Sequence, residues 1–262
     1  MSENESRLWF GTRPRSREAR VMLFCFPFSG GGASVYHAWR QLLPAEIEVV
    51  PVRLPGREAR MREPAEISVP TIARVLAERI DLPFAIYGHS MGARVGFEVL
   101  RALRALPVPD PVRFYPAASL PPDQPDPFAA CVELDDEPFV DALINHLGAP
   151  EELRDVSQLR RFQLPLLRND LGWCHRYRYA PGPPLSTAIV AMAGQADRVA
   201  TPAAMAGWSR QGQQGTVVTV AGGHFFVRTT AGWLTSVLAR DLLGAVGGAG
   251  PAPGHIPLGT SW

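Results

Sequence analysis

Six short apolar runs are spaced along the chain, and each has the length of a buried strand. Residues 21–27 are apolar throughout, which is typical of a parallel strand covered on both faces. The expected strands are 21–27, 48–53, 84–87, 112–115, 188–192 and 216–220. Their short lengths and apolar character favour a sheet that lies inside the molecule.

Between most of these runs, apolar residues recur at helical spacing. The expected helices are 35–43, 69–80, 91–106, 202–210 and 226–243. Strands that alternate with helices indicate a doubly wound, mostly parallel sheet of the α/β class. The sequence therefore predicts an α/β core made of 21–119 and 183–243, preceded by an N-terminal segment, 1–20.

Residues 120–182 break this alternation, because they contain helical patterns and no convincing strand. Helices are expected at 136–147, 151–156 and 159–179, the last with a kink at Pro165. The insertion has apolar residues with no sheet to cover: Phe139, Leu143, Leu147, Phe162, Leu166 and Leu167. We interpret it as a helical lid over an active site. The alternative is a helical layer that only packs on the sheet.

The Gly/Pro-rich tail, 244–262, is expected to be disordered. The chain is 46% hydrophobic and carries a net charge of +1, which argues against nucleic-acid binding. Its apolar runs fall short of the roughly 18 residues that suggest a membrane span. The polar, partly acidic start is unlike a signal peptide.

The chain has three cysteines, an odd number without paired spacing. This pattern favours a reducing compartment, so we expect a cytoplasmic protein. No C-x-x-C pair is present, and we expect neither a metal nor a bound cofactor.

The pentapeptide at 88–92 carries the clearest chemical signal. It reads Gly-His-Ser-Met-Gly, directly after one expected strand and directly before an expected helix. This is the G-x-S-x-G nucleophile elbow, a sharp turn that exposes the hydroxyl of Ser90 above the sheet. The alternative is a serine in an ordinary tight turn.

A serine hydroxyl needs a base, and the best candidate is His224 in the loop after the last strand. The acid that orients this imidazole should lie between Ser90 and His224 in the chain. Asp197, just past the strand at 188–192, fits that position. Asp123, after the strand at 112–115, is the second candidate, although its place between prolines also suits a turn.

The oxyanion of a tetrahedral intermediate needs two backbone N–H donors. Met91 follows the nucleophile and is expected to supply one. Phe28 or Ser29 is expected to supply the other; both lie in the glycine-rich loop, residues 27–33, which follows the first strand. This loop is neither a G-x-G-x-x-G fingerprint nor a P-loop, since the chain contains no lysine.

Five blocks of the sequence together resemble the type II thioesterases, stand-alone enzymes that accompany polyketide and nonribosomal peptide synthetases. The blocks are 24–33, 54–60, 88–92, 176–179 and 222–226. Two places depart from the family pattern: Leu54 stands where a tyrosine is frequent, and 116–120 lacks the usual Ser-Gly-Arg turn. These departures concern the pocket more than the chemistry.

The resemblance implies an α/β-hydrolase fold with a helical lid, and a triad at Ser90, Asp197 and His224. It also implies hydrolysis of acyl thioesters on the phosphopantetheine arm of acyl or peptidyl carrier proteins, which clears aberrant or stalled acyl groups. The residues alone leave open a small-molecule esterase or lipase on the same triad, or a non-catalytic module of hydrolase fold.

Overall fold

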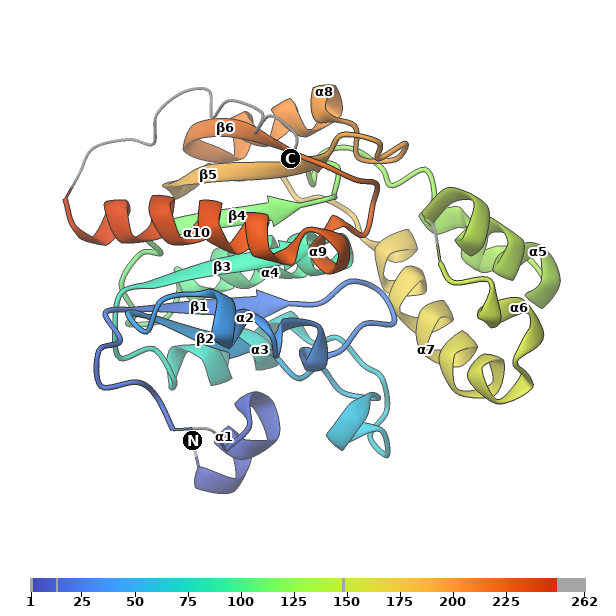
Figure 1. Cartoon of the computed structure of the whole chain (residues 1–262), viewed down its shortest axis with the longest axis horizontal. Helices are drawn as coiled ribbons and strands as arrows, with labels where there is room; N and C mark the ends of the chain where they lie inside the picture. The colour runs from blue at the N-terminus through green and yellow to red at the C-terminus, as the bar shows by residue number, and fades with distance from the viewer. Residues whose placement is uncertain (1, 13, 148, 249–262) are drawn as a thin grey trace.

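The computed structural model describes residues 2–12, 14–147 and 149–248, and it is built around a six-stranded parallel sheet (Figure 1). The strands are β1 (Val21–Phe26), β2 (Ile47–Pro51), β3 (Phe84–His89), β4 (Arg113–Ala117), β5 (Leu185–Gly194) and β6 (Gly212–Val220). Their order is β2-β1-β3-β4-β5-β6, and every neighbouring pair is parallel. All six predicted strands are present, and the predicted α/β class is confirmed.

The inner strands β1 and β3 are buried on both faces, which explains why they read as continuous apolar runs, whereas the edge strand β6 is largely exposed. Along β1, Phe24 packs into the core on one face, while Leu23 packs into a second core on the other. One face is covered by α3 (Val69–Ala77) and α4 (Met91–Leu103), and the other by α2 (Trp39–Leu42) and α10 (Ala231–Val246). Because the strands are parallel, their carboxyl ends lie at one edge of the sheet, where loops from distant parts of the sequence meet.

Several predicted helices are shorter than expected or divided. The remaining short helices are α8 (Pro202–Met205), α9 (Phe226–Thr229) and the 3-10 helices Ala33–Tyr36, Glu58–Arg60, Ala129–Glu133 and Ala206–Gln211. Helix α10 continues to Val246, three residues past its predicted end at Leu243. The rest of the predicted disordered tail, 249–262, lies outside the described residues.

The N-terminal segment contains a helix that the sequence pattern did not predict. Helix α1 (Glu3–Phe10) begins at Ser2, whose hydroxyl accepts a hydrogen bond from the Glu5 N–H. Its last residues, Trp9 and Phe10, are buried, and Phe10 stacks edge-on against Phe24 at 6.0 Å between ring centroids. The apolar part is too short to show helical periodicity, so only tertiary packing reveals it.

Residues between β4 and β5 form a helical segment at the carboxyl edge of the sheet (Figure 1). It contains α5 (Asp136–Ala142), a π-helical turn (Leu143–Leu147), α6 (Glu152–Asp155) and α7 (Ser157–Arg176). Its own small core includes Phe139, Leu143 and Leu171. Phe162, one of the apolar residues of the insertion, does not pack in this core or line a pocket, because its side chain is 66% exposed.

Among the described residues, no helix combines the length and the apolar composition needed to cross a membrane.

Helix α4 lies so close to β1 that only glycine fits at Gly92, where a Cβ would lie 2.3 Å from the Phe26 carbonyl oxygen. Gly92→Ala should therefore lower the free energy of unfolding by at least about 2 kcal/mol, because backbone must move. Gly244→Ala is the matched control, since a Cβ there meets nothing within 4 Å. It should raise stability by up to about 1 kcal/mol. Urea unfolding of both variants checks this, and equal stabilities would contradict it.

Candidate active site

The elbow between β3 and α4 holds Ser90 in a backbone conformation that L-residues rarely adopt. Its φ is 53° and its ψ −119°, and its N–H donates to the Ala117 carbonyl at 2.8 Å. Two glycines make this turn possible: a Cβ on Gly88 would lie 2.2 Å from the Gly92 carbonyl oxygen. Strain of this kind costs about 1–3 kcal/mol and persists where surrounding structure imposes it.

The structure brings the three predicted triad residues together. His224 Nε2 lies 3.1 Å from Ser90 Oγ, and His224 Nδ1 lies 2.8 Å from Asp197 Oδ2. These residues stand on the loops after β3, β5 and β6, and a Cβ on Gly194 would meet the Gly223 carbonyl oxygen at 2.5 Å. The loops after β5 and β6 therefore touch, and this contact sets the distance from acid to base.

Asp197 is held in its charged form. Burial opposes ionisation, but the hydrogen bond and charge of His224 outweigh it and keep the pKa of Asp197 below its usual range. The N–H groups of Val199 and Ala200 also donate to Asp197 Oδ1, at 2.8 and 3.0 Å. A charged, anchored carboxylate can fix the imidazole so that Nδ1 carries a proton and Nε2 is free to accept one.

His89 is fully buried behind the base and orients it from the other side. Its Nε2 donates to the His224 carbonyl at 2.7 Å, and its Nδ1 accepts from the Tyr87 hydroxyl at 3.1 Å. Burial, together with the nearby His224, lowers the pKa of His89 to about 3. His89 is therefore a neutral support for the backbone of His224.

Asp123, the second candidate for the acid, lies elsewhere. Its carboxylate pairs with Arg210 at 2.8 Å, and both side chains are partly exposed. Within the described ranges, no three His, Cys, Asp or Glu side chains gather closely enough to hold a metal ion.

The candidate oxyanion-hole residues also meet at Ser90. Phe28 and Ser29 line a cavity of about 40 Å³ together with Ser90 and His224. Met91 is the first residue of α4, so its N–H has no partner within the helix. The hydroxyl of Ser29 is buried and has no hydrogen-bond partner among the described residues, which leaves it free to donate.

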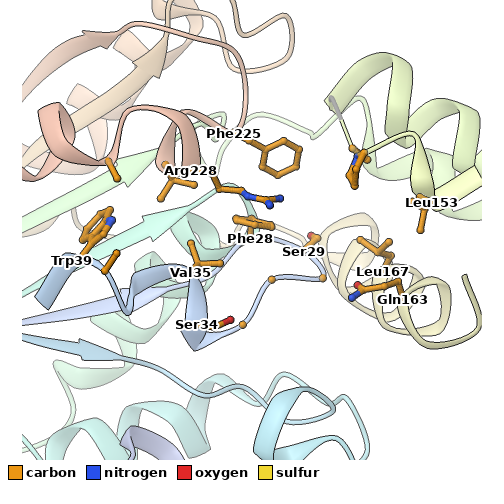
Figure 2. Close-up of a pocket in the computed structure, with 18 residues that line it drawn as sticks. Phe28, Ser29, Ser34, Val35, Trp39, Leu153, Gln163, Leu167, Phe225 and Arg228 are labelled. Carbon is orange, nitrogen blue, oxygen red and sulfur yellow. The ribbon is translucent and has the colours of Figure 1, made fainter. Parts of the chain in front are cut away.

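A larger pocket of about 650 Å³ opens beside this cavity and shares Phe28, Ser29 and Phe225 with it. Figure 2 shows Leu153, Gln163 and Leu167 of the helical segment on one side of it, and residues of the glycine-rich loop on the other. A volume of this size is typical of a small-molecule site. Leu143, Leu167 and Leu171 line the small cavity, so helical-segment residues border Ser90 directly.

Sequence reasoning missed three charged residues at this site. Arg57 and Asp170 form a buried ion pair, with side-chain exposures of 3% and 0%, against the glycine-rich loop. Glu58 accepts hydrogen bonds from two N–H groups of the same loop. The only signal for Arg57 and Glu58 was the block at 54–60, and nothing marked Asp170, which is 113 residues away from Arg57.

Comparisons with known proteins point to one family. A family model described as "Thioesterase domain" matches residues 21–240. The chain is 34% identical over 242 residues to linear gramicidin dehydrogenase LgrE of Brevibacillus parabrevis, covering 89% of this chain and 92% of LgrE. It is 34% identical over 224 residues to gramicidin S biosynthesis protein GrsT of Aneurinibacillus migulanus, covering 84% and 88%. The solved structure of the type II thioesterase BorB from the borrelidin cluster is 30% identical, with a TM-score of 0.79 and coverage of 89% and 97%.

Because the pKa of His89 is lowered in the folded protein, we expect the free energy of unfolding to decrease as the pH falls below about 6.5. The unfolded chain protonates this imidazole near pH 6.5, but the folded protein does so only near pH 3. Between these values the unfolded state binds more protons, so His89 lowers stability by up to about 1.4 kcal/mol per pH unit as pH falls. His89→Gln keeps a hydrogen-bond donor and an acceptor but does not titrate. Its free energy of unfolding, measured with urea between pH 7.5 and 4.5, should therefore depend less on pH than that of the wild-type protein. The same pH dependence in both proteins would show that His89 does not have a lowered pKa.

Proposed function

The chain belongs to the thioesterase family, as a type II thioesterase, and we propose that Ser90, His224 and Asp197 form its catalytic triad. It hydrolyses acyl thioesters carried on the phosphopantetheine arm of carrier proteins, and so removes aberrant or stalled acyl groups in polyketide or nonribosomal peptide biosynthesis. The single observation that carries the triad is the hydrogen-bonded series from Ser90 Oγ through His224 to Asp197.

Acylation begins when His224 Nε2 accepts the proton of Ser90 Oγ, which attacks the thioester carbonyl carbon. The N–H of Met91 and that of Phe28 or Ser29 stabilise the resulting oxyanion. The C–S bond then breaks, and His224 returns its proton to the departing pantetheine sulfur. Asp197 stays ionised and stabilises the imidazolium between these two transfers.

Deacylation repeats these steps with water as the nucleophile. His224 Nε2 removes a proton from water, whose oxygen attacks the carbonyl of the Ser90 ester. The tetrahedral adduct collapses, Ser90 Oγ regains the proton from His224, and the free carboxylic acid leaves. Besides water, these steps use only side chains and backbone groups of this chain, and the phosphopantetheine arrives with the carrier protein.

The pockets support a path for the substrate. The pocket of about 650 Å³ receives the pantetheine arm and leads toward Ser90. The cavity of about 40 Å³ at Ser90 holds no more than a very short acyl group. The helical segment 120–182 therefore acts as a mobile lid that must shift to admit longer chains.

The name of LgrE denotes a dehydrogenase, but no observation on this chain favours hydride transfer. Residues 28–33 read Phe-Ser-Gly-Gly-Gly-Ala rather than a dinucleotide fingerprint. A nucleophile, a base and an acid within hydrogen-bond distance are the requirements of acyl transfer. The site therefore supports acyl transfer, and the match to the thioesterase family makes thioester hydrolysis the proposed reaction.

Ser90→Ala should abolish turnover and leave the fold intact, because the hydroxyl is the nucleophile. The expected loss in kcat is on the order of 10⁴- to 10⁶-fold. Hydrolysis of an acyl carrier protein substrate measures it, with circular dichroism as the check on folding. Activity within tenfold of the parent would disprove the assignment of Ser90.

Asp197→Asn should lower kcat by about 10³- to 10⁴-fold, because the imidazole tautomer is lost. Asp123→Asn is the matched control, since Asp123 pairs with Arg210 away from the site, and its kcat should change less than twofold. Steady-state kinetics of the two variants compares them. The reverse ranking would move the acid to Asp123.

Leu143→Trp should penalise long acyl chains more than acetyl, because Leu143 borders the cavity at Ser90. Each methylene that is no longer buried costs about 0.8 kcal/mol, or about fourfold in kcat/KM. Leu134→Trp is the matched control on an exposed residue of the lid. A hydrolysis profile from acetyl to octanoyl tests this, and two identical profiles would show that the helices are packing only.

A further inference from the structure

We propose that Arg57, Glu58 and Asp170 are positioning residues that hold the glycine-rich loop in place for oxyanion stabilisation. Through Asp170, they also tie this loop to helix α7 of the lid. The inference deepens the proposed function and rests on it. It assigns a role to the block at 54–60, which the triad leaves unexplained.

Asp170 is the centre of the arrangement. It lies on α7 with no exposed surface, and its Oδ2 accepts from the Gly30 N–H and from Arg57 Nη1, both at 2.8 Å. Its Oδ1 accepts from Arg57 Nη2 at 2.9 Å, so the pair is bidentate. One carboxylate thus joins the lid, the glycine-rich loop and the 54–60 block through charge-assisted hydrogen bonds.

Arg57 and Glu58 form hydrogen bonds with the residues that follow Gly30, in the loop and at the start of the next 3-10 helix. Arg57 Nη1 also donates to the Gly31 carbonyl at 3.1 Å. The two carboxylate oxygens of Glu58 accept from the N–H groups of Ala33 and Ser34, at 3.0 and 2.9 Å. Glu58 adopts a φ of 50°, an unfavourable conformation that these bonds help to maintain.

The pinned residues directly follow the candidate oxyanion donors. Phe26 is fixed in β1, and Gly30 is fixed by Asp170, so only three residues lie between two anchors. The Gly31 N–H donates to the Phe28 carbonyl at 2.8 Å and closes the turn. The direction of the Phe28 and Ser29 N–H groups is therefore set by the anchors, because so short a span has little freedom.

The loop also contacts the lid directly at Gly30. Gly30 has a φ of 76°, and a Cβ there would lie 2.7 Å from a methyl group of Leu167 on α7. Leu167 and Leu171, on either side of Asp170, line the cavity at Ser90. A shift of α7 would therefore move Gly30 and the oxyanion donors with it, which links lid position to catalytic competence.

Stability alone gives a weak reason for burying this pair. Taking two charges out of water costs about as much as their attraction returns, and apolar side chains of similar volume can serve the fold equally well. What apolar side chains cannot do is bond the Gly30 N–H and the Gly31 carbonyl. The loop contacts are thus the specific contribution of the pair.

The test compares Asp170→Asn and the double variant Arg57→Met/Asp170→Leu with the wild-type protein. The double variant removes both charges and keeps apolar volume, so it remains informative if Asp170→Asn fails to fold. Asp241→Asn is the matched control, because Asp241 forms a mostly buried pair with Arg113 between α10 and β4, outside the site. Readouts are kcat and KM for acetyl-N-acetylcysteamine, whose short acyl group requires no shift of the lid. The affinities of a trifluoromethyl ketone analogue and of a thioether analogue without the carbonyl are measured alongside.

We expect the folded variants to lose about 100-fold in kcat, the scale of one misplaced oxyanion donor, with KM within threefold of the wild type. Affinity for the ketone, which forms a tetrahedral adduct, should fall by a similar factor, while affinity for the thioether stays unchanged. Asp241→Asn should lower the melting temperature and keep kcat within twofold.

A kcat and a ketone affinity within twofold of wild type in either folded variant would overturn the inference. An increase in KM with an unchanged kcat would also overturn it, because the pair would then contribute equally to binding of the substrate and of the transition state. Failure of the proposed function is distinguishable: it would show as no thioester hydrolysis by the wild-type protein, or as full activity of Ser90→Ala.

Discussion

The close approach of helix α4 to strands β1 and β3 is the constraint on which the site depends. It is possible only because Gly88 and Gly92 lack a Cβ, and it forces Ser90 into a left-handed φ of 53°. The same turn raises the hydroxyl above the sheet and places the N–H of Met91 at the free end of a helix. The same backbone turn thus positions both the proposed nucleophile, Ser90, and one proposed oxyanion donor, the N–H of Met91.

The other groups reach Ser90 because parallel strands end at a common edge. Loops after β1, β5 and β6 carry the residues proposed as the second donor, the acid and the base, from positions far apart in the chain. Each is fixed by buried polar contacts: Asp197 by two backbone N–H groups, His224 by His89, and the glycine-rich loop by Asp170. Such groups need little reorganisation during the reaction, which is the usual source of electrostatic catalysis.

The strands, the elbow and the meeting of Ser90, Asp197 and His224 could be predicted because each has a signature in the sequence. Continuous apolar runs mark the strands, glycines at fixed offsets mark the turn at Ser90, and chain order singles out Asp197 and His224. Tertiary features had no such signature. Asp170 looks like an ordinary polar residue of an amphipathic helix, helix α1 depends on packing at its end, and Phe162 follows the apolar pattern of α7 yet faces outward. The sequence could not say which side of α7 faces the core of the helical segment.

The most direct test of the account is the mass of the covalent intermediate. The wild-type protein is mixed with an acyl-loaded carrier protein, quenched in acid within milliseconds, and digested for mass spectrometry. The account predicts that the peptide containing Ser90 gains the mass of the acyl group, as an ester on the Ser90 hydroxyl. An acyl group found on another residue, or turnover with none on Ser90 at any time point, would contradict it.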